Sequence, residues 1–235
     1  MTTVLCDGDI IAYRCAASCL RQGQLVEPVE VAQMRVNDLM YRIIQETEST
    51  AYRVFIGGVD NFRYQLYPAY KANRRDTEKP AWLEACREQL VVEWQAQVVN
   101  GMETDDMLGI LQTDDTIIAS IDKDLLCIPG RHFNFVKQEF YTVSEIDGIR
   151  HFYLQLIMGD RSDNIPGYDG VMRIKPPKFL IPLIEELSAC ETEEEMETLV
   201  KDVYTDKAQY EINKKLLWIL REHPIEQNGF RETSQ

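Results

Sequence analysis

The chain has 235 residues, 45% hydrophobic and 27% charged, which excludes a disordered chain, a membrane-spanning helix and an array of several domains. Its six cysteines form no CxxC pair, so we expect reduced thiols in a cytoplasm rather than structural zinc or a disulfide framework. The net charge of −14 argues against a polyanionic partner, but residues 63–79 and 170–184 each carry a net charge of +3.

Strands and helices are predicted to alternate through the first 140 residues, because short β-rich apolar runs are separated by amphipathic segments. In chain order we predict a strand over 3–7, a helix from Asp9, a helix over 30–46, a strand over 51–56, a helix opened by Pro80, a strand over 95–100, a helix capped by Thr104 and a strand over 116–121. This alternation predicts an α/β fold with a mainly parallel, doubly wound sheet.

The remainder of the chain is predicted to be helical. Helices are expected over 151–158, 182–189, 193–203 and 206–221, and Thr192 with Glu195 forms a capping-box pattern for the third of them. We therefore divide the chain into an α/β core over residues 1–150 and a helical C-terminal region over residues 151–235.

Acidic residues follow the predicted strands. Eight of them lie in four separate segments: Asp7, Glu103, Asp105, Asp106, Asp122, Asp124, Asp160 and Asp163. Because the carboxyl ends of parallel strands meet at one crevice, we expect these side chains to share a pocket. Asp122 and Asp124, two residues apart on a strand, are expected to project to the same side.

Such a pocket needs counter-charges, since carboxylates a few ångströms apart repel one another strongly in a protein cleft. Oxygen ligands suit Mg²⁺ or Mn²⁺, and shared carboxylates suit two such ions. A pair of divalent cations acts naturally on phosphate esters, which makes phosphodiester hydrolysis the predicted chemistry.

A basic stretch interleaved with aromatic residues follows the second predicted strand. It contains Arg63, Tyr64, Tyr67, Tyr70, Lys71 and Arg74. Such a stretch is suited to single-stranded or frayed DNA. The alternative is a solvated helix face with buried tyrosines.

Five stretches in this order resemble those of the 5′-nuclease family, the flap endonucleases and 5′–3′ exonucleases of phages and of the N-terminal domains of bacterial DNA polymerases. The stretches are CDGDIIAYR (6–14), NFRYQLYPAYKANR (61–74), ETDDMLGIL (103–111), SIDKDLLCIPG (120–130) and MGDRSDNIPG (158–167). The resemblance implies a PIN-like nuclease core, an arch over about 61–94 and a modified helix-hairpin-helix element over about 158–189.

The resemblance also implies the roles of individual residues. The eight acids would hold two divalent cations, Lys71 and Arg74 would act at the scissile phosphate, and Tyr70 would stack on a terminal base. The residues implied to contact DNA are Arg63, Tyr70, Lys71, Arg74, Arg173, Lys175 and Lys178. The implied substrate is DNA with 5′ ends, flaps or nicks, cut in the cytoplasm (that of the host for a viral protein). No membrane partner is expected, and the oligomeric state stays open.

Three positions depart from the family pattern. Ile56 stands where an aspartate usually ends the second strand, so we expect either that Asp60 substitutes for it or that the second metal is held more weakly. Gln155 stands where a basic residue is common. Met172 replaces the last glycine of the hairpin loop, which leaves K⁺ binding at the hairpin open.

Three alternatives stay open. A catalytically attenuated protein of this fold would bind branched DNA without cutting it. A haloacid dehalogenase-like phosphatase would carry its aspartate pair on the first strand, whereas Asp122 and Asp124 follow the fourth, and Leu125 stands where that fold has Thr or Val. An RNA-cleaving relative is not excluded, because a metal site reads the phosphate and not the sugar.

Overall fold

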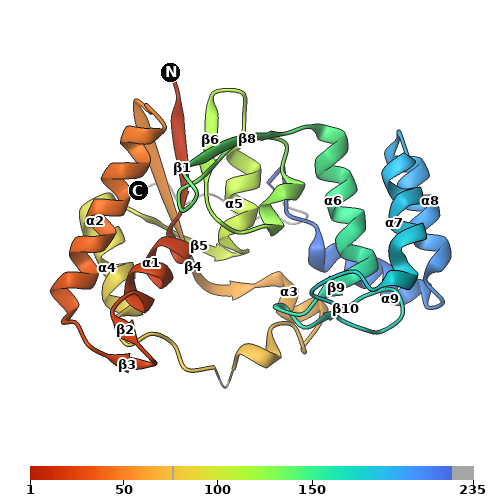
Figure 1. The fold of residues 1–235 in the computed structure, drawn as a ribbon, viewed down its shortest axis with the longest axis horizontal. Helices are drawn as coiled ribbons and strands as arrows, with labels where there is room; N and C mark the ends of the chain where they lie inside the picture. Colours follow the sequence, from red (N-terminus) through yellow and green to blue (C-terminus); the bar gives the residue numbers. More distant parts are fainter. Residues whose placement is uncertain (76, 224–235) are drawn as a thin grey trace, which may run out of the picture.

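A six-stranded sheet forms the centre of the α/β part of the computed structural model, which describes residues 1–75 and 77–223 (Figure 1). The strand order is β5-β4-β1-β6-β7-β8, and all neighbours are parallel except β7 and β8. The strands are β1 (Thr3–Asp7), β4 (Ala51–Asn61), β5 (Gln97–Gly101), β6 (Thr116–Ala119), β7 (Gly130–Asn134) and β8 (Glu139–Val143). The predicted mainly parallel sheet is confirmed.

The chain reverses its direction of travel across the sheet beside β1. It runs outward from β1 through β4 to β5, and then crosses back to place β6 on the other side of β1. Such a switch point opens a crevice at the carboxyl ends of the two strands that flank it. Asp7 ends β1 at this place.

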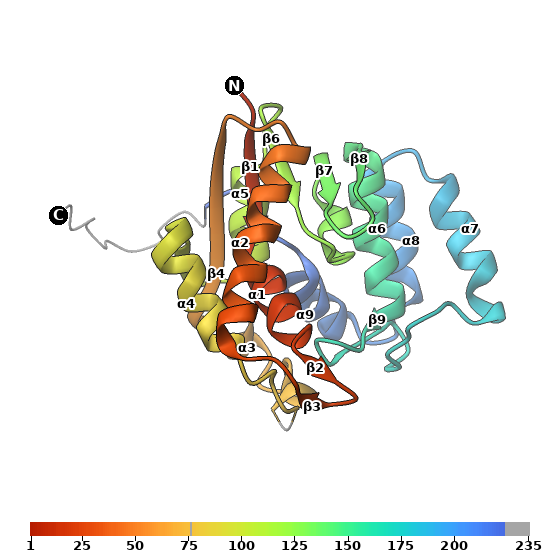
Figure 2. The same ribbon diagram turned by 60° about the vertical axis from the view of Figure 1, so that its left-hand side comes forward.

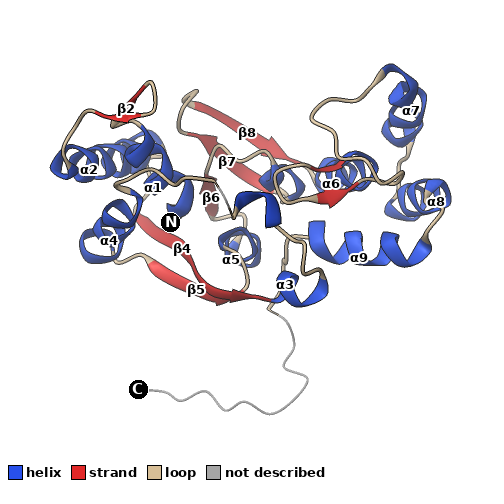
Figure 3. Cartoon of the chain, turned by 90° about the horizontal axis from the view of Figure 1, so that it is seen from below, coloured by secondary structure: helices blue, strands red, loops and turns tan. Residues whose placement is uncertain are grey.

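Helices cover both faces of the sheet, as expected for a doubly wound fold. Helices α1 (Gly8–Ala17), α2 (Val29–Glu46) and α4 (Leu83–Trp94) pack together on one face, and α5 (Thr104–Leu111) lies on the other (Figures 2 and 3). Side chains alternate between the two cores along each strand. Val54 and Ile56 face the first three helices, while Phe55 between them faces the core around α5.

The C-terminal part is a group of helices built on α6 (Glu145–Met158), which packs against α7 (Ile181–Ala189), α8 (Glu193–Val203) and α9 (Lys207–Leu217) (Figure 1). Their apolar residues join the core on the α5 face of the sheet. The Tyr204 hydroxyl donates to the carbonyl oxygen of Leu156 at 2.6 Å, which ties α8 to α6. The division that we place at residue 150 falls inside α6.

Short elements complete the described chain. They are β2 (Leu20–Arg21), β3 (Gln24–Leu25), α3 (Phe62–Leu66), β9 (Gly159–Asp160), β10 (Ile165–Pro166) and the 3₁₀ turns η1 (Ala72–Arg74), η2 (Asp124–Cys127) and η3 (Lys178–Leu180). Within residues 1–75 and 77–223, no helix has the length and apolar character needed to cross a bilayer.

Several element boundaries differ from the sequence-based expectations. Strand β4 continues five residues past Ile56, and the hairpin of β7 and β8 was not predicted. Helix α4 begins at Leu83, so Pro80 lies before it. Thr104 is the first residue of α5 rather than its cap, because Glu103 and Asp106 form the capping box there. The predicted capping box of α8 is confirmed.

Candidate metal centre and phosphate site

A cavity of about 310 Å³ lies over the carboxyl ends of the parallel strands. Six of the eight predicted carboxylates line it, and they come from all four predicted segments. These six are Asp7, Glu103, Asp105, Asp122, Asp124 and Asp163. The structure therefore brings most of the predicted acidic residues together.

Asp7 is held at the switch point by two hydrogen bonds. One carboxylate oxygen accepts from the backbone N–H of Ile10 at 3.1 Å and caps α1, and the other accepts from the Ser120 hydroxyl at 2.7 Å. Gly8 lets α1 start directly against β4, since a β-carbon there would lie 2.5 Å from the carbonyl oxygen of Phe55. The first carboxylate is thus fixed at the floor of the cavity.

Asp106 does not face the cavity, which corrects the prediction that it is a metal ligand. Its carboxylate is fully buried and accepts two hydrogen bonds from the Arg63 guanidinium, at 2.6 and 2.8 Å, and one from the backbone N–H of Leu220. Successive helical residues point about 100° apart, so Asp105 and Asp106 face different surroundings. Only Asp105 reaches the cavity.

Arg63 and Tyr70 are buried, which corrects their predicted contacts with DNA. The Arg63 side chain is 2% exposed and also donates to the carbonyl oxygens of Leu216 and Trp218. Tyr70 is 1% exposed, so its ring has no free face on which a base could stack. The alternative of buried tyrosines within the basic stretch therefore describes Tyr70 correctly.

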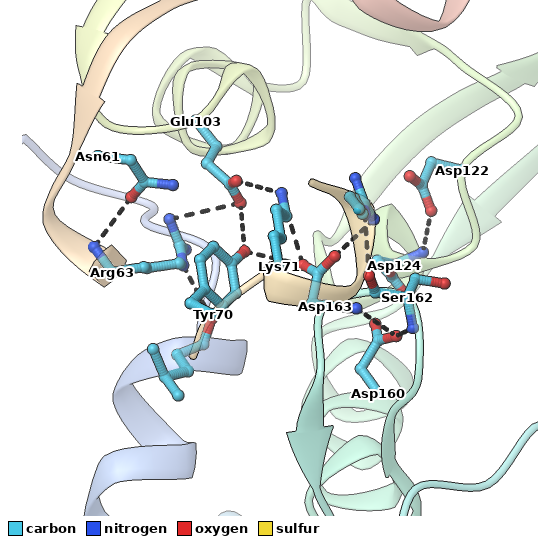
Figure 4. Close-up of polar contacts among 12 residues, drawn as sticks. Asn61, Arg63, Tyr70, Lys71, Glu103, Asp122, Asp124, Asp160, Ser162 and Asp163 are labelled. Carbon is cyan, nitrogen blue, oxygen red and sulfur yellow. Dashed lines mark hydrogen bonds and ion pairs between the residues drawn. The ribbon is translucent and has the colours of Figure 1, made fainter. Parts of the chain in front are cut away.

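Lys71 and Arg74 lie at the rim of the cavity, where each binds carboxylates. Figure 4 shows Lys71 between Glu103 and Asp163. The Lys71 ammonium contacts Glu103 and lies 3.6 Å from Asp163, and Arg74 contacts Asp163 at 2.5 Å. Because 52% of the Arg74 side chain is exposed, it could turn toward a phosphate without a large rearrangement. Lys71 is more deeply placed, at 18% exposure.

Asp122 and Asp124 line the cavity but do not share a strand, which corrects the predicted reason for their common orientation. Strand β6 ends at Ala119, and the Asp122 carboxylate accepts from the backbone N–H of Asp124 at 2.9 Å in the following turn. The Gln155 side chain donates to Asp124 at 2.9 Å, so a neutral amide occupies the place of the basic residue that the family commonly has.

Asp160 is buried beside the cavity and does not line it. Its carboxylate accepts from the backbone N–H groups of Ser162 and Asp163, at 2.6 and 3.3 Å. These bonds shape the loop that presents Asp163 (Figure 4). The position of Asp160 is therefore that of a loop-ordering residue.

Two aspartates lie where they could replace the second-strand aspartate that is absent at Ile56. Ile56 points into the core under α1, while Asp60 is exposed and lines the cavity. Asp9 also lines it and accepts from the Gly57 N–H at 2.7 Å and the Thr104 hydroxyl at 2.6 Å. Asp9 was not among the predicted ligands, although its spacing of two from Asp7 was a usable signal.

The predicted duplex-binding residues lie in the segment between α6 and α7. Lys175 and Lys178 are exposed, whereas the Arg173 guanidinium is paired with Asp169, at 2.7 Å for one of its contacts. The segment forms the small β9–β10 hairpin and then η3. Met172 lies in its irregular part.

Comparison with known proteins assigns most of the chain to a family. The family model described as 5′–3′ exonuclease, N-terminal resolvase-like domain, matches residues 2–151. The chain belongs to this 5′–3′ exonuclease family.

Curated relatives of this exonuclease domain include two bacterial polymerases. DNA polymerase I of Bacillus caldotenax is 26% identical over 250 residues, which cover 95% of this chain and 28% of that protein. The thermostable DNA polymerase I of Thermus aquaticus is 27% identical over 233 residues, 91% of this chain and 26% of that protein. The chain thus spans about a quarter of the length of these relatives.

Solved structures show the same fold. The bacteriophage T5 5′-exonuclease with bound zinc ions superposes with a TM-score of 0.62 at 18% identity, covering 92% of this chain and 89% of that chain. The bacteriophage T5 flap endonuclease in a complex with DNA and metal ions also gives a TM-score of 0.62 at 18% identity, with 94% and 89% coverage.

Burial makes the carboxylates of this exonuclease-family site hard to ionise without a counter-charge. Desolvation, with nearby carboxylates such as Asp122, raises the pKa of Asp7 to about 7 and that of Asp124 to about 8. The pKa of Asp105 is raised well above its usual value for the same reasons. A cation in the cavity would remove much of this cost.

The donor set fits a hard divalent cation, because every acidic ligand candidate at the cavity offers carboxylate oxygens. In the part of the chain that the structure describes, no three acidic, histidine or cysteine side chains are gathered closely enough to hold a metal ion. Lys71 and Arg74 instead occupy Glu103 and Asp163. The chemistry of the site fits the ion, while the side chains still have to converge on it.

In the absence of divalent cations, the melting temperature is expected to fall as the pH rises from about 7 to about 8. A raised pKa means that folded Asp7 and Asp124 hold protons that the unfolded chain releases at about pH 4. Stability therefore falls from that pH upward, and the fall ends once the pH has passed the folded pKa values of about 7 and about 8. Unfolded cysteines, with an ordinary pKa of about 8.5, begin to ionise at the upper end of this window and lower stability in the same direction, because burial raises the pKa of the folded thiols. Thermal melts in EDTA would measure the slope, which saturating Mg²⁺ or the change Asp7→Asn should reduce. A melting temperature that rises across the window contradicts this expectation.

Proposed function

We propose that the chain is a structure-specific 5′-nuclease, a 5′–3′ exonuclease or flap endonuclease that hydrolyses DNA phosphodiester bonds with two divalent cations. The observation that carries the proposal is the cavity at the carboxyl ends of the sheet, where six carboxylates from four segments face two basic side chains. Such a hydrolysis requires carboxylates that bind the divalent cations and positively charged groups that bind the phosphate. Both are present at this cavity.

The residues at the cavity divide into two groups by what they would do. Asp7, Glu103, Asp105, Asp122, Asp124 and Asp163 would hold two Mg²⁺ or Mn²⁺ ions. When bound, these ions would supply an activated water and a counter-charge for the leaving 3′-oxygen. Lys71 and Arg74 would bind the scissile phosphate and offset the charge that develops on it.

Exposed lysines extend the proposed interface beyond the cavity. Lys175 and Lys178 lie in the segment that follows Asp160 and Asp163, and no acidic residue occurs from 170 to 184. They would bind the phosphates of a duplex without reading its sequence. K⁺ binding in this segment is not part of the proposal.

The test is a panel of 5′-labelled flap, nicked, gapped and blunt DNA substrates with matched RNA strands, incubated with increasing Mn²⁺ or Mg²⁺. The proposal expects metal-dependent cleavage near the 5′ end of the DNA substrates, suppressed by EDTA. Tight flap binding without cleavage at any Mn²⁺ concentration would instead indicate a branched-DNA-binding protein. Preferred cleavage of the RNA strands would show that the substrate is RNA rather than DNA.

Asp60, in β4, and Asp9, in the first turn of α1, are expected to differ in their effects on cleavage. Asp60→Asn should lower the rate by about tenfold at limiting Mn²⁺ if Asp60 replaces the family's second-strand ligand, because one charge near the cations is lost. Raising the Mn²⁺ concentration should restore the rate. Asp9→Asn is the matched comparison, and an unchanged rate for Asp60→Asn with a reduced one for Asp9→Asn would assign the role to Asp9.

A further inference from the structure

Tyr70 and Lys71, neighbours in the sequence, reach the same two carboxylates. The Tyr70 hydroxyl lies 2.8 Å from Glu103 and 2.8 Å from Asp163 (Figure 4). The Lys71 ammonium contacts Glu103 and lies 3.6 Å from Asp163. Glu103 caps α5 and Asp163 belongs to the loop after β9, so this pair of residues joins two segments that are 60 positions apart.

The two contacts are chemically different. A phenol has one proton and no charge, so it donates to one of the two carboxylates at a time, or shares its proton between them, and leaves their mutual repulsion uncancelled. The ammonium has three donors and a full positive charge, which does offset that repulsion. Tyr70 therefore anchors the two carboxylates beside one hydroxyl. Lys71 is the cation that lies near both of them, in addition to Arg74 on Asp163 and Arg63 at 3.8 Å from Glu103.

The surroundings hold the Tyr70 ring in place, whereas the Lys71 ammonium can move away from the carboxylates. The Tyr70 ring is buried in the core and packs edge-on against Tyr64, with ring centroids 5.6 Å apart. Its backbone is anchored from both sides, since Ala69 accepts from the Asn164 side chain at 2.8 Å and the Lys71 N–H donates to the carbonyl oxygen of Asp163 at 2.9 Å. The Lys71 ammonium sits at the end of a flexible stem at the cavity rim.

We propose that Tyr70 is a positioning residue that keeps Glu103 and Asp163 side by side at the cavity, and that Lys71 is the counter-charge which a divalent cation displaces there. This inference rests on the proposed function, because it concerns the same site. Displacement would release the Lys71 ammonium toward a substrate phosphate. Cation binding and phosphate binding would then be linked through one side chain.

The test measures Mn²⁺ binding to the full chain by electron paramagnetic resonance, without DNA. Tyr70→Phe keeps the buried ring and removes the hydroxyl, and it is expected to weaken Mn²⁺ binding by about tenfold. Lys71→Met removes the competing charge and is expected to strengthen Mn²⁺ binding by about fivefold. Tyr67→Phe, a hydroxyl deletion in the same segment at a residue outside the cavity lining, is the control and should leave binding unchanged.

The opposite signs separate this proposal from a general structural role. Weaker Mn²⁺ binding in both variants, or equal binding in Tyr70→Phe and Tyr67→Phe, would overturn it. If Tyr70→Phe does not fold, as judged by its thermal melt, the sign of the Lys71→Met effect decides. Cleavage by the unmodified chain with unchanged Mn²⁺ binding in the variants would refute this inference alone, whereas the predicted binding shifts without any cleavage would refute only the nuclease function.

Discussion

Replacement of Arg63 by methionine is expected to lower the free energy of unfolding by about 3–5 kcal/mol, since it leaves the Asp106 carboxylate buried without its partner. The pair is completely enclosed: Arg63 is 2% exposed and Asp106 is 0% exposed. Arg63 also satisfies two carbonyl oxygens at the end of α9, so its loss leaves these acceptors unpaired as well.

Urea unfolding of Arg63→Met would measure this effect, with Arg74→Met as the matched control. The Arg74 side chain, which makes an ion pair with Asp163, is about half exposed to solvent. Its replacement should therefore lower the free energy of unfolding by less than about 1 kcal/mol. The double change Arg63→Met with Asp106→Leu should recover much of the loss, because no buried charge then remains unpaired. An Arg63→Met protein as stable as Arg74→Met would contradict the buried pair.

Asp122→Asn is expected to reduce cleavage by about a thousandfold, because it removes a charge from the cavity at the switch point. The change is nearly isosteric. The amide oxygen can still accept from the Asp124 N–H, which the Asp122 carboxylate does at 2.9 Å, so the turn after β6 should be kept. A loss of activity would therefore report the missing charge rather than a collapsed loop.

Initial rates on a 5′-labelled flap would measure this loss, alongside a thermal melt of each variant. Asp114→Asn is the control, since Asp114 is exposed just before β6, at the opposite end of that strand. Its rate should match that of the unmodified chain. A rate for Asp122→Asn within tenfold of the unmodified chain would remove Asp122 from the proposed metal ligands.

The carboxylate positions were predictable because each depends on local pattern. Asp7 follows a short apolar run, and Glu103 and Asp105 precede an amphipathic segment, so their places at strand and helix ends can be read from neighbouring residues. Knowledge that parallel strands share one functional edge then suffices to group them. This reasoning correctly placed six carboxylates around one cavity.

The errors concern residues whose surroundings come from distant parts of the chain. Arg63 resembles a solvent-facing DNA contact in its own segment, but its partners are Asp106 and the carbonyl oxygens of residues 216 and 218. The same holds for Tyr70, whose hydroxyl contacts Asp163, 93 residues further along the chain. Such long-range contacts cannot be predicted from the local pattern of apolar and polar residues.

The amino-acid sequence by itself determined the alternation of strands and helices and the acidic residues at their ends, since short-range periodicity and capping set these features. The tertiary structure alone decided which of two adjacent acids, Asp105 or Asp106, faces the cavity and which is neutralised by Arg63 in the interior. The physical reason is that a buried charge requires a partner, and the packing of distant segments determines where that partner lies.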